Sequence, residues 1–488
     1  MTMILTRILI GISFGFFLST CDSNAVESPV WPAADALAPL DSEIHAPKER
    51  VLTLEQARSL YDKDIDWSDD AKTQAARLQA VARIEALIER YLDPADAPSV
   101  QERRAILKAL TSIGAPPRAY EAVLLYGGVK KEFTERSSVV KAFDKNFKPL
   151  PEDPEKDQPL EITVTVALPK DYSPYKRYPL AFGGGPWAEE ECLRIANIVE
   201  ENSHWKAAPI YMTWRGRAKF NALFKELSRQ FSIDPDRIAV GGYSVGGTAA
   251  LRWALYLPDR FCAVDAQAGV APSALDLPFV VNYKPIPVWL RHEFNHTHTP
   301  PEIVKAFQTE AQKAGVALTL TSDVEPKDSD AKAIASFKEA ARASVRDLYA
   351  KHIEFANNDA QVNRKAWVRV DEYETRDNPE LALKLHAPDG ANKGQDLEIK
   401  KLRVNAATVD AQIDGNTVKL STKFAKTLTL FLSARMLDLD KPITVIADGR
   451  TLFTKKAAPP SLEFMLEEAR QSGRRDRAYW TSLSMTLH

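Results

Sequence analysis

The sequence predicts an α/β fold: a parallel sheet with helices on both faces, preceded by a helical module and followed by a small antiparallel β module. Three patterns support this prediction. Residues 51–158 show mainly amphipathic helix periodicity, residues 159–356 alternate between strand and helix patterns, and residues 357–488 carry short alternating strands. Single strands that alternate with helices build parallel sheets, because each parallel connection must return the chain across one face of the sheet.

The length and charge of the chain restrict its architecture and its partners. At 488 residues it exceeds a single average domain, which favours a central domain with appended modules. Its 64 lysines and arginines nearly balance its 66 aspartates and glutamates, so the chain has no strong positive field to attract nucleic acid. We therefore expect no nucleic-acid partner.

Residues 1–21 have the pattern of an export signal. Arg7 precedes the apolar run 8–18, which is too short to span a bilayer and has the length of a signal-peptide core. The following Leu18-Ser19-Thr20-Cys21 resembles a bacterial lipobox, which implies lipidation of Cys21 and attachment at the cell envelope. Cleavage without lipidation, which gives a secreted protein, is the alternative. Contact with a membrane is expected only through this anchor.

A tether and a helical module are expected next. Residues 22–50 are rich in Pro and Ala and lack hydrophobic periodicity, which indicates a flexible tether. Within residues 51–158, apolar side chains recur at three- and four-residue spacing from Leu78 to Tyr91, before Asp93-Pro94 ends the helix. A second helix is expected at 101–113, and the Pro-rich stretch 148–159 is a linker. We expect no chemistry in this module.

The central domain, residues 159–356, has interleaved elements. Strands are expected at 161–168, 179–182, 209–213, 237–241, 263–268, 286–290 and 316–321, and helices at 189–201, 219–231, 248–256, 302–314 and around 331–351. Functional groups in such a sheet lie at the carboxyl ends of the strands. Only Cys192 and Cys262 remain beyond Cys21, so we expect either one disulfide or two free thiols.

The last module, residues 357–488, reads as antiparallel β structure. Val409, Ala411 and Ile413 alternate with polar residues up to Asp414-Gly415, a hairpin signal. Further strands are expected at 428–432 and 443–445, and a helix at 461–471.

The motif that carries chemistry is Gly242-Tyr243-Ser244-Val245-Gly246. It joins a predicted strand to a predicted helix through Ser244, and a serine on so sharp a turn has a strained backbone. Gly242 and Gly246 leave room where a side chain would collide. The helix beyond the serine directs its N-terminal amides toward the oxygen that becomes negative during acyl transfer.

This region resembles the α/β-hydrolase superfamily, particularly polyhydroxybutyrate-depolymerase-like and feruloyl-esterase-like enzymes and peptidases related to prolyl oligopeptidase. The resemblance covers about residues 162–315, including Leu168-Pro-Lys-Asp-Tyr172 and Leu257-Pro-Asp-Arg-Phe261. It implies an α/β-hydrolase fold with Ser244 as the nucleophile and a small-molecule, peptide or polyester substrate.

The resemblance also implies an oxyanion site. In those families the glycines after the strand at Pro179 supply one donor, and Phe182-Gly-Gly-Gly-Pro-Trp187 stands at that place here. The oxyanion donors would be the amides of Val245 and one of Gly184 or Gly185. Tyr243 and Trp187, which flank these donors, are candidate substrate-binding residues. A glycine turn that merely joins a strand to a helix is the alternative.

The partners of Ser244 are not at the expected positions. A serine needs a base within hydrogen-bond reach and a third group to orient that base. Relatives carry an aspartate just after the strand at 286–290, where this sequence reads Arg291-His-Glu-Phe-Asn-His-Thr-His298, with His296 at the position of the acid. The histidine is expected after the strand ending near Thr321, but residues 322–330 contain none.

Three interpretations remain. In the first the triad is rearranged, with His296 or His298 as base, oriented by one of three carboxylates: Asp323, Asp328 or Glu293. In the second His352, expected at a helix end, is the base and Asp265 the acid. In the third, hydrolysis is lost and the fold binds a ligand or acts as a scaffold at the cell envelope.

The histidines at 292, 296 and 298 have a spacing that could bind a metal, but no thiol or paired carboxylate completes a familiar ligand set. We therefore read them as a solvated loop and expect no metal and no cofactor. The sequence favours an exported serine hydrolase that cleaves a carboxylic ester or peptide bond through a Ser244 acyl-enzyme.

Overall fold

In the computed structural model the chain divides into two units, 1–30 and 31–488, and every residue that the structure describes lies in the second. The described residues are 71–93, 98–113, 117–126, 137–139, 165–167, 178–184, 205–207, 224, 231, 233–272, 276–297, 299–323, 325, 327–358, 363–374, 381–386, 396–402 and 406–487. The predicted signal peptide with Cys21, the tether, the helix at 189–201 and Cys192 lie outside them. None of the described helices has the length and apolar character needed to cross a membrane.

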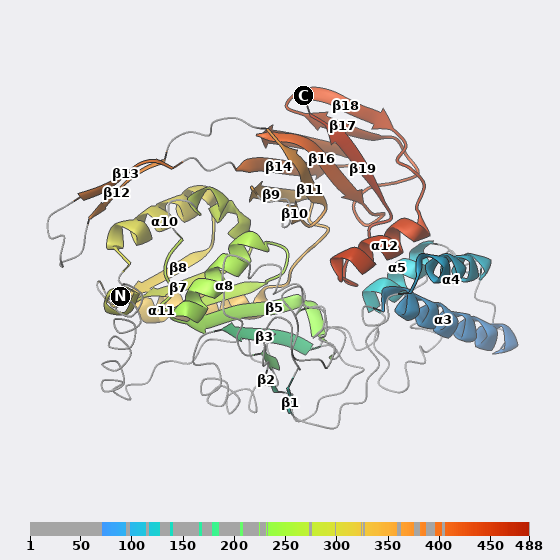
Figure 1. Cartoon of the computed structure of the whole chain (residues 1–488), viewed down its shortest axis with the longest axis horizontal. Coiled ribbons are helices and arrows are strands. Elements are labelled where there is room, and N and C mark those ends of the chain that lie inside the picture. Colours follow the sequence, from blue (N-terminus) through green and yellow to red (C-terminus); the bar gives the residue numbers. More distant parts are fainter. Residues whose placement is uncertain are drawn as a thin grey trace, which may run out of the picture. The chain divides into compact units, whose positions relative to one another are not determined.

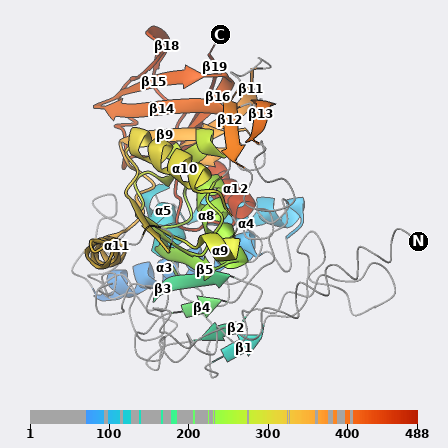
Figure 2. The ribbon, with the colours of Figure 1, turned by 90° about the vertical axis from the view of Figure 1, so that its left-hand side faces the viewer.

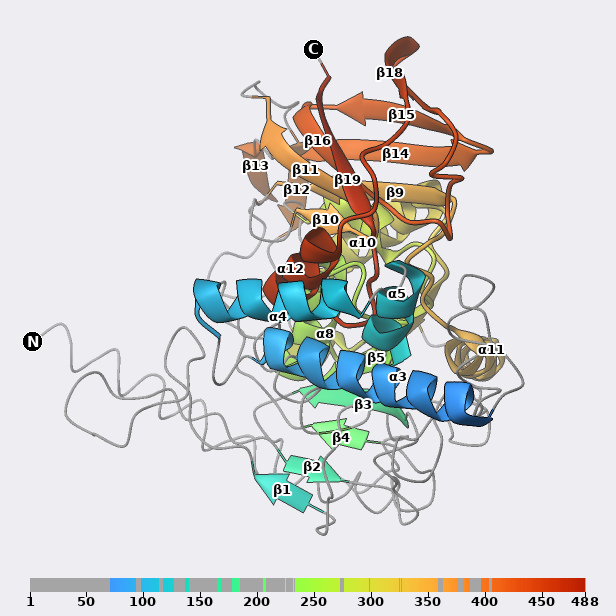
Figure 3. The ribbon, with the colours of Figure 1, turned by 90° about the vertical axis from the view of Figure 1, so that its right-hand side faces the viewer.

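The helical module contains α3 (Ala71–Leu92), α4 (Val100–Ser112) and α5 (Pro117–Tyr126), as its periodicity predicted. Ser99 begins α4 with a capping box, since its hydroxyl accepts from Glu102 N while the Glu102 carboxylate accepts from Ser99 N. These helices share a hydrophobic cluster with the C-terminal helix α12 (Leu462–Ser472), and Figure 3 shows them beside it. The buried Trp480 donates from Nε1 to Glu121 of α5 at 2.9 Å, which fixes the module to the C-terminal segment.

The central domain is built on an eight-stranded sheet of order β1-β2-β4-β3-β5-β6-β7-β8 (Figure 1). The strands are β1 (Ser137–Val139), β2 (Thr165–Ala167), β3 (Tyr178–Gly184), β4 (Trp205–Ala207), β5 (Ile233–Tyr243), β6 (Ala263–Gln267), β7 (Val288–His292) and β8 (Leu318–Ser322). From β4 through β8 every neighbouring pair is parallel, and β1 and β2 add antiparallel pairs at one edge. The strand predicted at 209–213 lies outside the described residues, and β4 precedes it.

Helices cover both faces of this sheet. On one face α8 (Val245–Tyr256) and α10 (Pro301–Ala314) pack on side chains that include Val288 and Leu290 of β7 (Figure 2). Trp289 lies between those two residues and therefore points to the opposite face. There it contacts Phe337 of α11 (Asp330–Ala343), with ring centroids 5.6 Å apart. Cys262 is buried and free, and burial raises the pKa of its thiol to about 12.

The C-terminal strands form two main sheets around one hydrophobic cluster. One contains β10 (Arg364–Lys365), β11 (Val368–Tyr373), β16 (Ala425–Leu432) and β19 (Thr481–Thr486), and the other β18 (Arg450–Lys455), β17 (Ile443–Ala447), β15 (Thr417–Lys423), β14 (Ala407–Asp414) and β9 (His352–Asn357). The strands β12 (Leu381–His386) and β13 (Asp396–Leu402) pair separately. The predicted hairpin is present as β14–β15. In addition β15 pairs in parallel with β17, which the alternation of apolar and polar residues could not indicate.

The helix predicted over 331–351 ends at Ala343, so His352 begins a strand instead of ending a helix. The physical reason lies in the segment between them. Ser344 leaves the helical conformation, Arg346 is then buried against Asp236 and Asp476, and Leu348 enters the C-terminal cluster. The first strand of the C-terminal sheet thus begins at His352, before the predicted start of the module at residue 357.

A buried ionic network joins the central domain to the C-terminal segment. The Arg346 Nη2 donates to Asp236 Oδ1 and to Asp476 Oδ2, both at 2.8 Å. Arg474 donates to both oxygens of Asp476 and, at 2.7 Å, to the Asp259 carbonyl. Burial by itself would raise the pKa of the Asp259 and Asp476 carboxyls, but the surrounding guanidiniums outweigh it and hold both well below their usual range.

We predict that Asp476→Asn lowers the free energy of unfolding by about 3–5 kcal/mol, because it leaves buried guanidiniums without a counter-charge. Asp414→Asn is the control, since Asp414 is exposed and pairs only with the exposed Lys419; its loss should cost less than about 1 kcal/mol. Urea unfolding followed by circular dichroism measures both. Equal midpoints for the two variants would contradict the prediction.

The same network predicts a pH dependence. Asp259 and Asp476 have folded pKa values below the unfolded value of about 4, so their contribution is fully present above about pH 4 and is lost as the pH falls toward the folded pKa. The urea midpoint should therefore decline on acidification below about pH 4, and Asp476→Asn should decline less steeply. If the urea midpoint of Asp476→Asn falls as steeply with decreasing pH as that of the wild type, Asp476 does not have this role.

Candidate active site

Ser244 lies at the turn between β5 and α8, at the carboxyl end of a central strand. Its backbone has φ 57° and ψ −118°, a combination that costs a residue with a side chain on the order of 1–3 kcal/mol. Such strain persists only where the surrounding structure enforces it. This is the bend from strand to helix that the glycine-serine motif predicted.

Hydrogen bonds to β6 and to the loop beyond it enforce the bend. The Ser244 amide donates to the Gln267 carbonyl at 2.9 Å, and the Ser244 carbonyl accepts from Thr248 N at 3.0 Å. The Thr248 hydroxyl donates to the same carbonyl at 3.2 Å and accepts from Val270 N at 2.8 Å. The serine is therefore attached to α8 and to the end of β6 at once.

Two glycines allow this close approach. A Cβ on Gly247 would lie 2.6 Å from the Gln267 carbonyl oxygen, and a Cβ on Gly269 would lie 2.8 Å from the Gly247 carbonyl carbon. Both distances are shorter than real side-chain contacts, and both obstructing atoms belong to backbone. The first turn of α8 can rest on the end of β6 only because neither residue has a side chain.

The surroundings of Ser244 suit a developing negative charge. Val245 is the first residue of α8, so its amide belongs to the N-terminal end of the helix, where the helix dipole is positive. Gly184 ends β3 and pairs in register with Gly242, one strand away from the serine. Of the other predicted oxyanion and substrate-binding residues, Gly185 and Trp187 lie outside the described residues.

The structure gathers several predicted residues beside the elbow. The Tyr243 hydroxyl donates to Glu293 Oε2 at 3.1 Å, and the Arg291 guanidinium lies 3.3 Å from Glu293 Oε1. The rings of Tyr243 and His296 are 5.0 Å apart between centroids. His296 is exposed, in the short helix α9 (Phe294–Thr297). The loop after β7 thus contacts the residue next to the nucleophile.

The loop after β8 contacts the same helix. Asp323 Oδ1 accepts from Phe294 N at 3.0 Å, at the start of α9, and Asp323 N donates to the His292 carbonyl at 3.1 Å. Asp323 and His296 therefore belong to adjoining loops at one edge of the sheet, as the rearranged triad requires. Asp328 is exposed, and His298 lies outside the described residues.

The prediction of a solvated loop is wrong for His292, because this residue lies in a buried strand. It ends β7, is 2% exposed, and both ring nitrogens lack a hydrogen-bond partner among the described residues. Burial lowers the pKa of its imidazole, while Asp323 and Glu293 partly offset that effect. The sequence signal was its place at the end of a buried strand, which the neighbouring His296 and His298 obscured.

His352 and Asp265, the alternative base and acid, lie on different sheets. His352 Nε2 is 2.9 Å from Asp410 Oδ1 in the β9–β14 pair. Asp265 is buried in β6, where it accepts a hydrogen bond from Gln267. Within the described part of the chain, no side chain makes a hydrogen bond with the Ser244 hydroxyl.

Comparison with protein families gives one match. Residues 207–370, about a third of the chain, match the family model described as "Putative esterase". The matched segment contains Ser244 and the loops after β7 and β8. The sequence has no significant match among curated proteins.

Solved structures to which the chain is similar include a thermostable esterase, with 17% identity and TM-score 0.32 over 43% of this chain. The chain spans 63% of that esterase. The 2,6-dihydroxy-pseudo-oxynicotine hydrolase has 15% identity and TM-score 0.30, covering 64% of this chain and 93% of its own. A ferulic acid esterase has 14% identity and TM-score 0.30, covering 42% and 95%.

The glycine contact gives a prediction about stability. Gly247→Ala and Gly269→Ala should each lower the free energy of unfolding by about 1–3 kcal/mol, because each forces backbone to shift. Since the two glycines share one contact, the double variant should lose less than the sum of the single losses. Thermal unfolding of the four proteins measures this. Single variants within about 0.5 kcal/mol of wild type would show that the contact is not tight.

Proposed function

We propose that the α/β-hydrolase domain of this chain is a serine hydrolase, which cleaves a carboxylic ester or a peptide bond through an acyl-enzyme on Ser244. The domain has the α/β-hydrolase fold, and the esterase family match supports a hydrolase function. The observation that carries the proposal is the strained Ser244 backbone at the strand-to-helix bend. Strain of this kind is concentrated at functional sites, and here it projects a hydroxyl beside a helix N-terminus.

The reaction begins with removal of the Ser244 hydroxyl proton by a histidine. The oxygen then attacks the substrate carbonyl carbon, and the resulting oxyanion accepts hydrogen bonds from the Val245 amide and a glycine amide at the end of β3. The protonated histidine returns the proton to the leaving group. Water, deprotonated by the same histidine, then releases the acyl group.

His296 is the proposed base, with Asp323 or Glu293 orienting it. The ring contact of His296 with Tyr243 supports this choice, since Tyr243 precedes the nucleophile. Asp323 is attached to the first residue of α9, the helix that carries His296. A change of the α9 backbone on substrate binding would bring the imidazole to the serine, as catalytic hydrogen bonds often tighten only in the complex.

The place of action is proposed from the N-terminal sequence. The charged residue at position 7, the apolar run 8–18 and Cys21 support export and attachment to a bacterial cell envelope, or secretion if Cys21 is not lipidated. The enzyme would then act on its substrate, a small ester, a peptide or a polyester, outside the cytoplasm.

A second candidate function is a ligand-binding protein that has lost hydrolysis. The observation that favours it is the lack of a hydrogen-bond partner for the Ser244 hydroxyl within the described residues. Such a protein would keep the strand-to-helix bend at Ser244 but would not form an acyl-enzyme.

A fluorophosphonate probe distinguishes the two functions. We expect covalent labelling of the wild type that disappears in Ser244→Ala, because only an activated serine attacks the phosphorus. Ester hydrolysis should fall at least about 10³-fold in the same variant. Thr248→Ser, which keeps a hydroxyl beside the Ser244 carbonyl, is the control and should still label. Absence of wild-type labelling from pH 5 to 9 would favour the binding protein.

The identity of the base is tested separately. His296→Ala should slow labelling and hydrolysis by about 10²–10⁴-fold, the usual contribution of a general base. His352→Ala should leave both rates unchanged, because His352 lies in the C-terminal sheet against Asp410. The reverse result would transfer the role of base to His352. If both variants label and hydrolyse at equal rates, neither His296 nor His352 is identified as the base, and His292 and His298 should be substituted in turn.

A further inference from the structure

Three side chains with metal-binding chemistry lie together on the face of the C-terminal sheet opposite its hydrophobic cluster, away from the elbow motif. They are His352 and Glu354 of β9 and Asp410 of β14, and one donor atom of each lies within 4.8 Å of the others. The set offers one imidazole nitrogen and two carboxylate oxygens. Nitrogen and oxygen ligands of these types bind Zn²⁺ and other divalent transition metals.

The strand register produces this arrangement. His352 and Glu354 are two residues apart on β9, so both point to one face, while Ile353 between them is buried in the C-terminal cluster. Asp410 pairs directly with Glu354, and the residue paired with His352 is Gln412. Two of the donors therefore lie on one face of β9, two residues apart. The third, Asp410, lies on β14 directly across from Glu354.

Two carboxylates directly opposite each other destabilise a sheet unless a cation lies near them. Here His352 Nε2 lies 2.9 Å from Asp410 Oδ1, and the Lys284 ammonium lies 2.5 Å from Glu354 Oε2. Among the described residues, Lys284 contacts one oxygen of Glu354 and His352 contacts one oxygen of Asp410. The second oxygen of each carboxylate is available there to a further cation.

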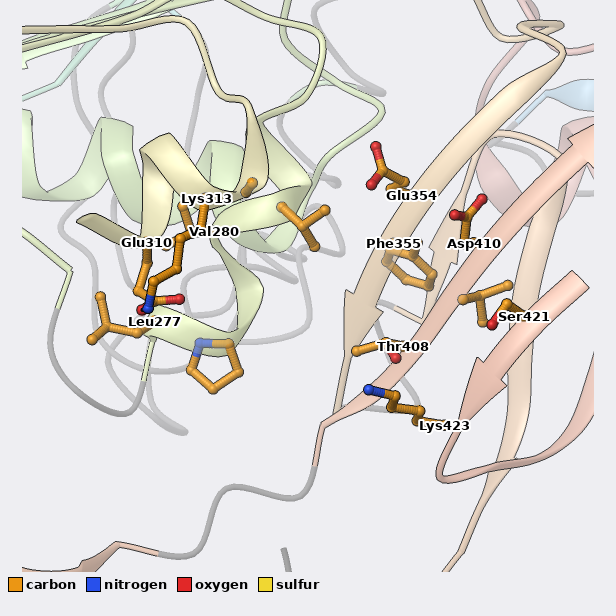
Figure 4. A pocket seen from close by; sticks show the side chains of 14 residues that line it. Leu277, Val280, Glu310, Lys313, Glu354, Phe355, Thr408, Asp410, Ser421 and Lys423 are labelled. Atoms are coloured by element: carbon orange, nitrogen blue, oxygen red, sulfur yellow. The ribbon is translucent and has the colours of Figure 1, made fainter. Parts of the chain in front are cut away.

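A cavity adjoins the cluster. It has a volume of about 440 Å³ and lies between η3 (Leu277–Tyr283) with α10 on one side and β9, β14 and β15 on the other. Glu354 and Asp410 both line it, and Figure 4 shows their carboxylates near each other on the strand side. A metal held by the three side chains would therefore have space for water or a small ligand at an open coordination position.

The fixed backbone supports the site. Ala356 of β9 exchanges hydrogen bonds with the Asn282 side chain, at 2.9 Å from its amide and 2.7 Å to its carbonyl. Buried Lys365 donates to the Glu354 carbonyl at 2.8 Å. These contacts fix the β9 backbone at Glu354 and at Ala356. Side-chain rotation would bring the three donors from within 4.8 Å of one another to the roughly 3.3 Å separation of a tetrahedral zinc site with bonds of about 2.0–2.1 Å.

We propose that His352, Glu354 and Asp410 bind one Zn²⁺ ion at the edge of the cavity between the central domain and the C-terminal sheet. The ion bridges β9 to β14 with its fourth position open toward the cavity. This site is independent of the serine chemistry, because its ligands lie on another sheet than Ser244.

The test is zinc binding to the full-length exported chain, measured by competition with a chromophoric chelator. We expect one equivalent of Zn²⁺ and a raised thermal midpoint in its presence, since the ion binds the folded state alone. His352→Ala and Asp410→Asn should each weaken Zn²⁺ binding by at least about tenfold. Removing only the hydrogen-bond partner of a metal ligand already lowers metal affinity by about 10–100-fold, and removing the ligand itself should lower it more.

Asp414→Asn is the matched control, because Asp414 lies on the same face of β14 but pairs with Lys419. It should bind Zn²⁺ as the wild type does, and circular dichroism should show all variants folded. The proposal is overturned if the wild type takes up no Zn²⁺, or if uptake is equal in the wild type and in both ligand variants. Fluorophosphonate labelling of Ser244 should be the same in every variant, so failure here would not affect the proposed hydrolase.

Discussion

The contact between the backbones of Gly247 and Gly269 is the constraint on which the rest of the candidate active site depends. It brings the first turn of α8 onto the end of β6, where the Gln267 carbonyl accepts a hydrogen bond from the Ser244 amide. The serine can then occupy a backbone conformation that would otherwise relax. The Ser244 hydroxyl and the N-terminus of α8 take their positions beside the end of β3 from this one close approach.

Contacts outside the sheet unite the central domain with the C-terminal strands. Arg346 and Arg474 both donate to the buried Asp476 carboxylate, while the Asn282 amide joins η3 to β9 as a strand edge would. Removing one partner of such a network costs more than the pair contributes, because the remaining charge is buried. The chain therefore keeps the C-terminal strands fixed against the central domain, and the proposed zinc site lies at that boundary.

The sequence located the nucleophile but left its partners open, and the reason is geometrical. Ser244 can be recognised from the sequence because one short segment contains the whole bend and its glycines. A base and an acid come from other loops, and spacing alone cannot say which loops meet. The structure brings His296, Glu293 and Asp323 to one edge of the sheet, whereas His352 faces Asp410 on another sheet. Gly185, Trp187, His298 and Cys21 remain predictions from sequence alone.

By itself the sequence determined the α/β character of the central domain, the strand-to-helix bend at Ser244 and the hairpin of β14 and β15, because each depends on local periodicity or on a few adjacent residues. Tertiary structure alone decided the end of the helix at Ala343, the parallel pairing of β15 with β17 and the meeting of Glu354 with Asp410. These features depend on which distant segments pack together, and the free energy of that packing is not contained in any short stretch of chain.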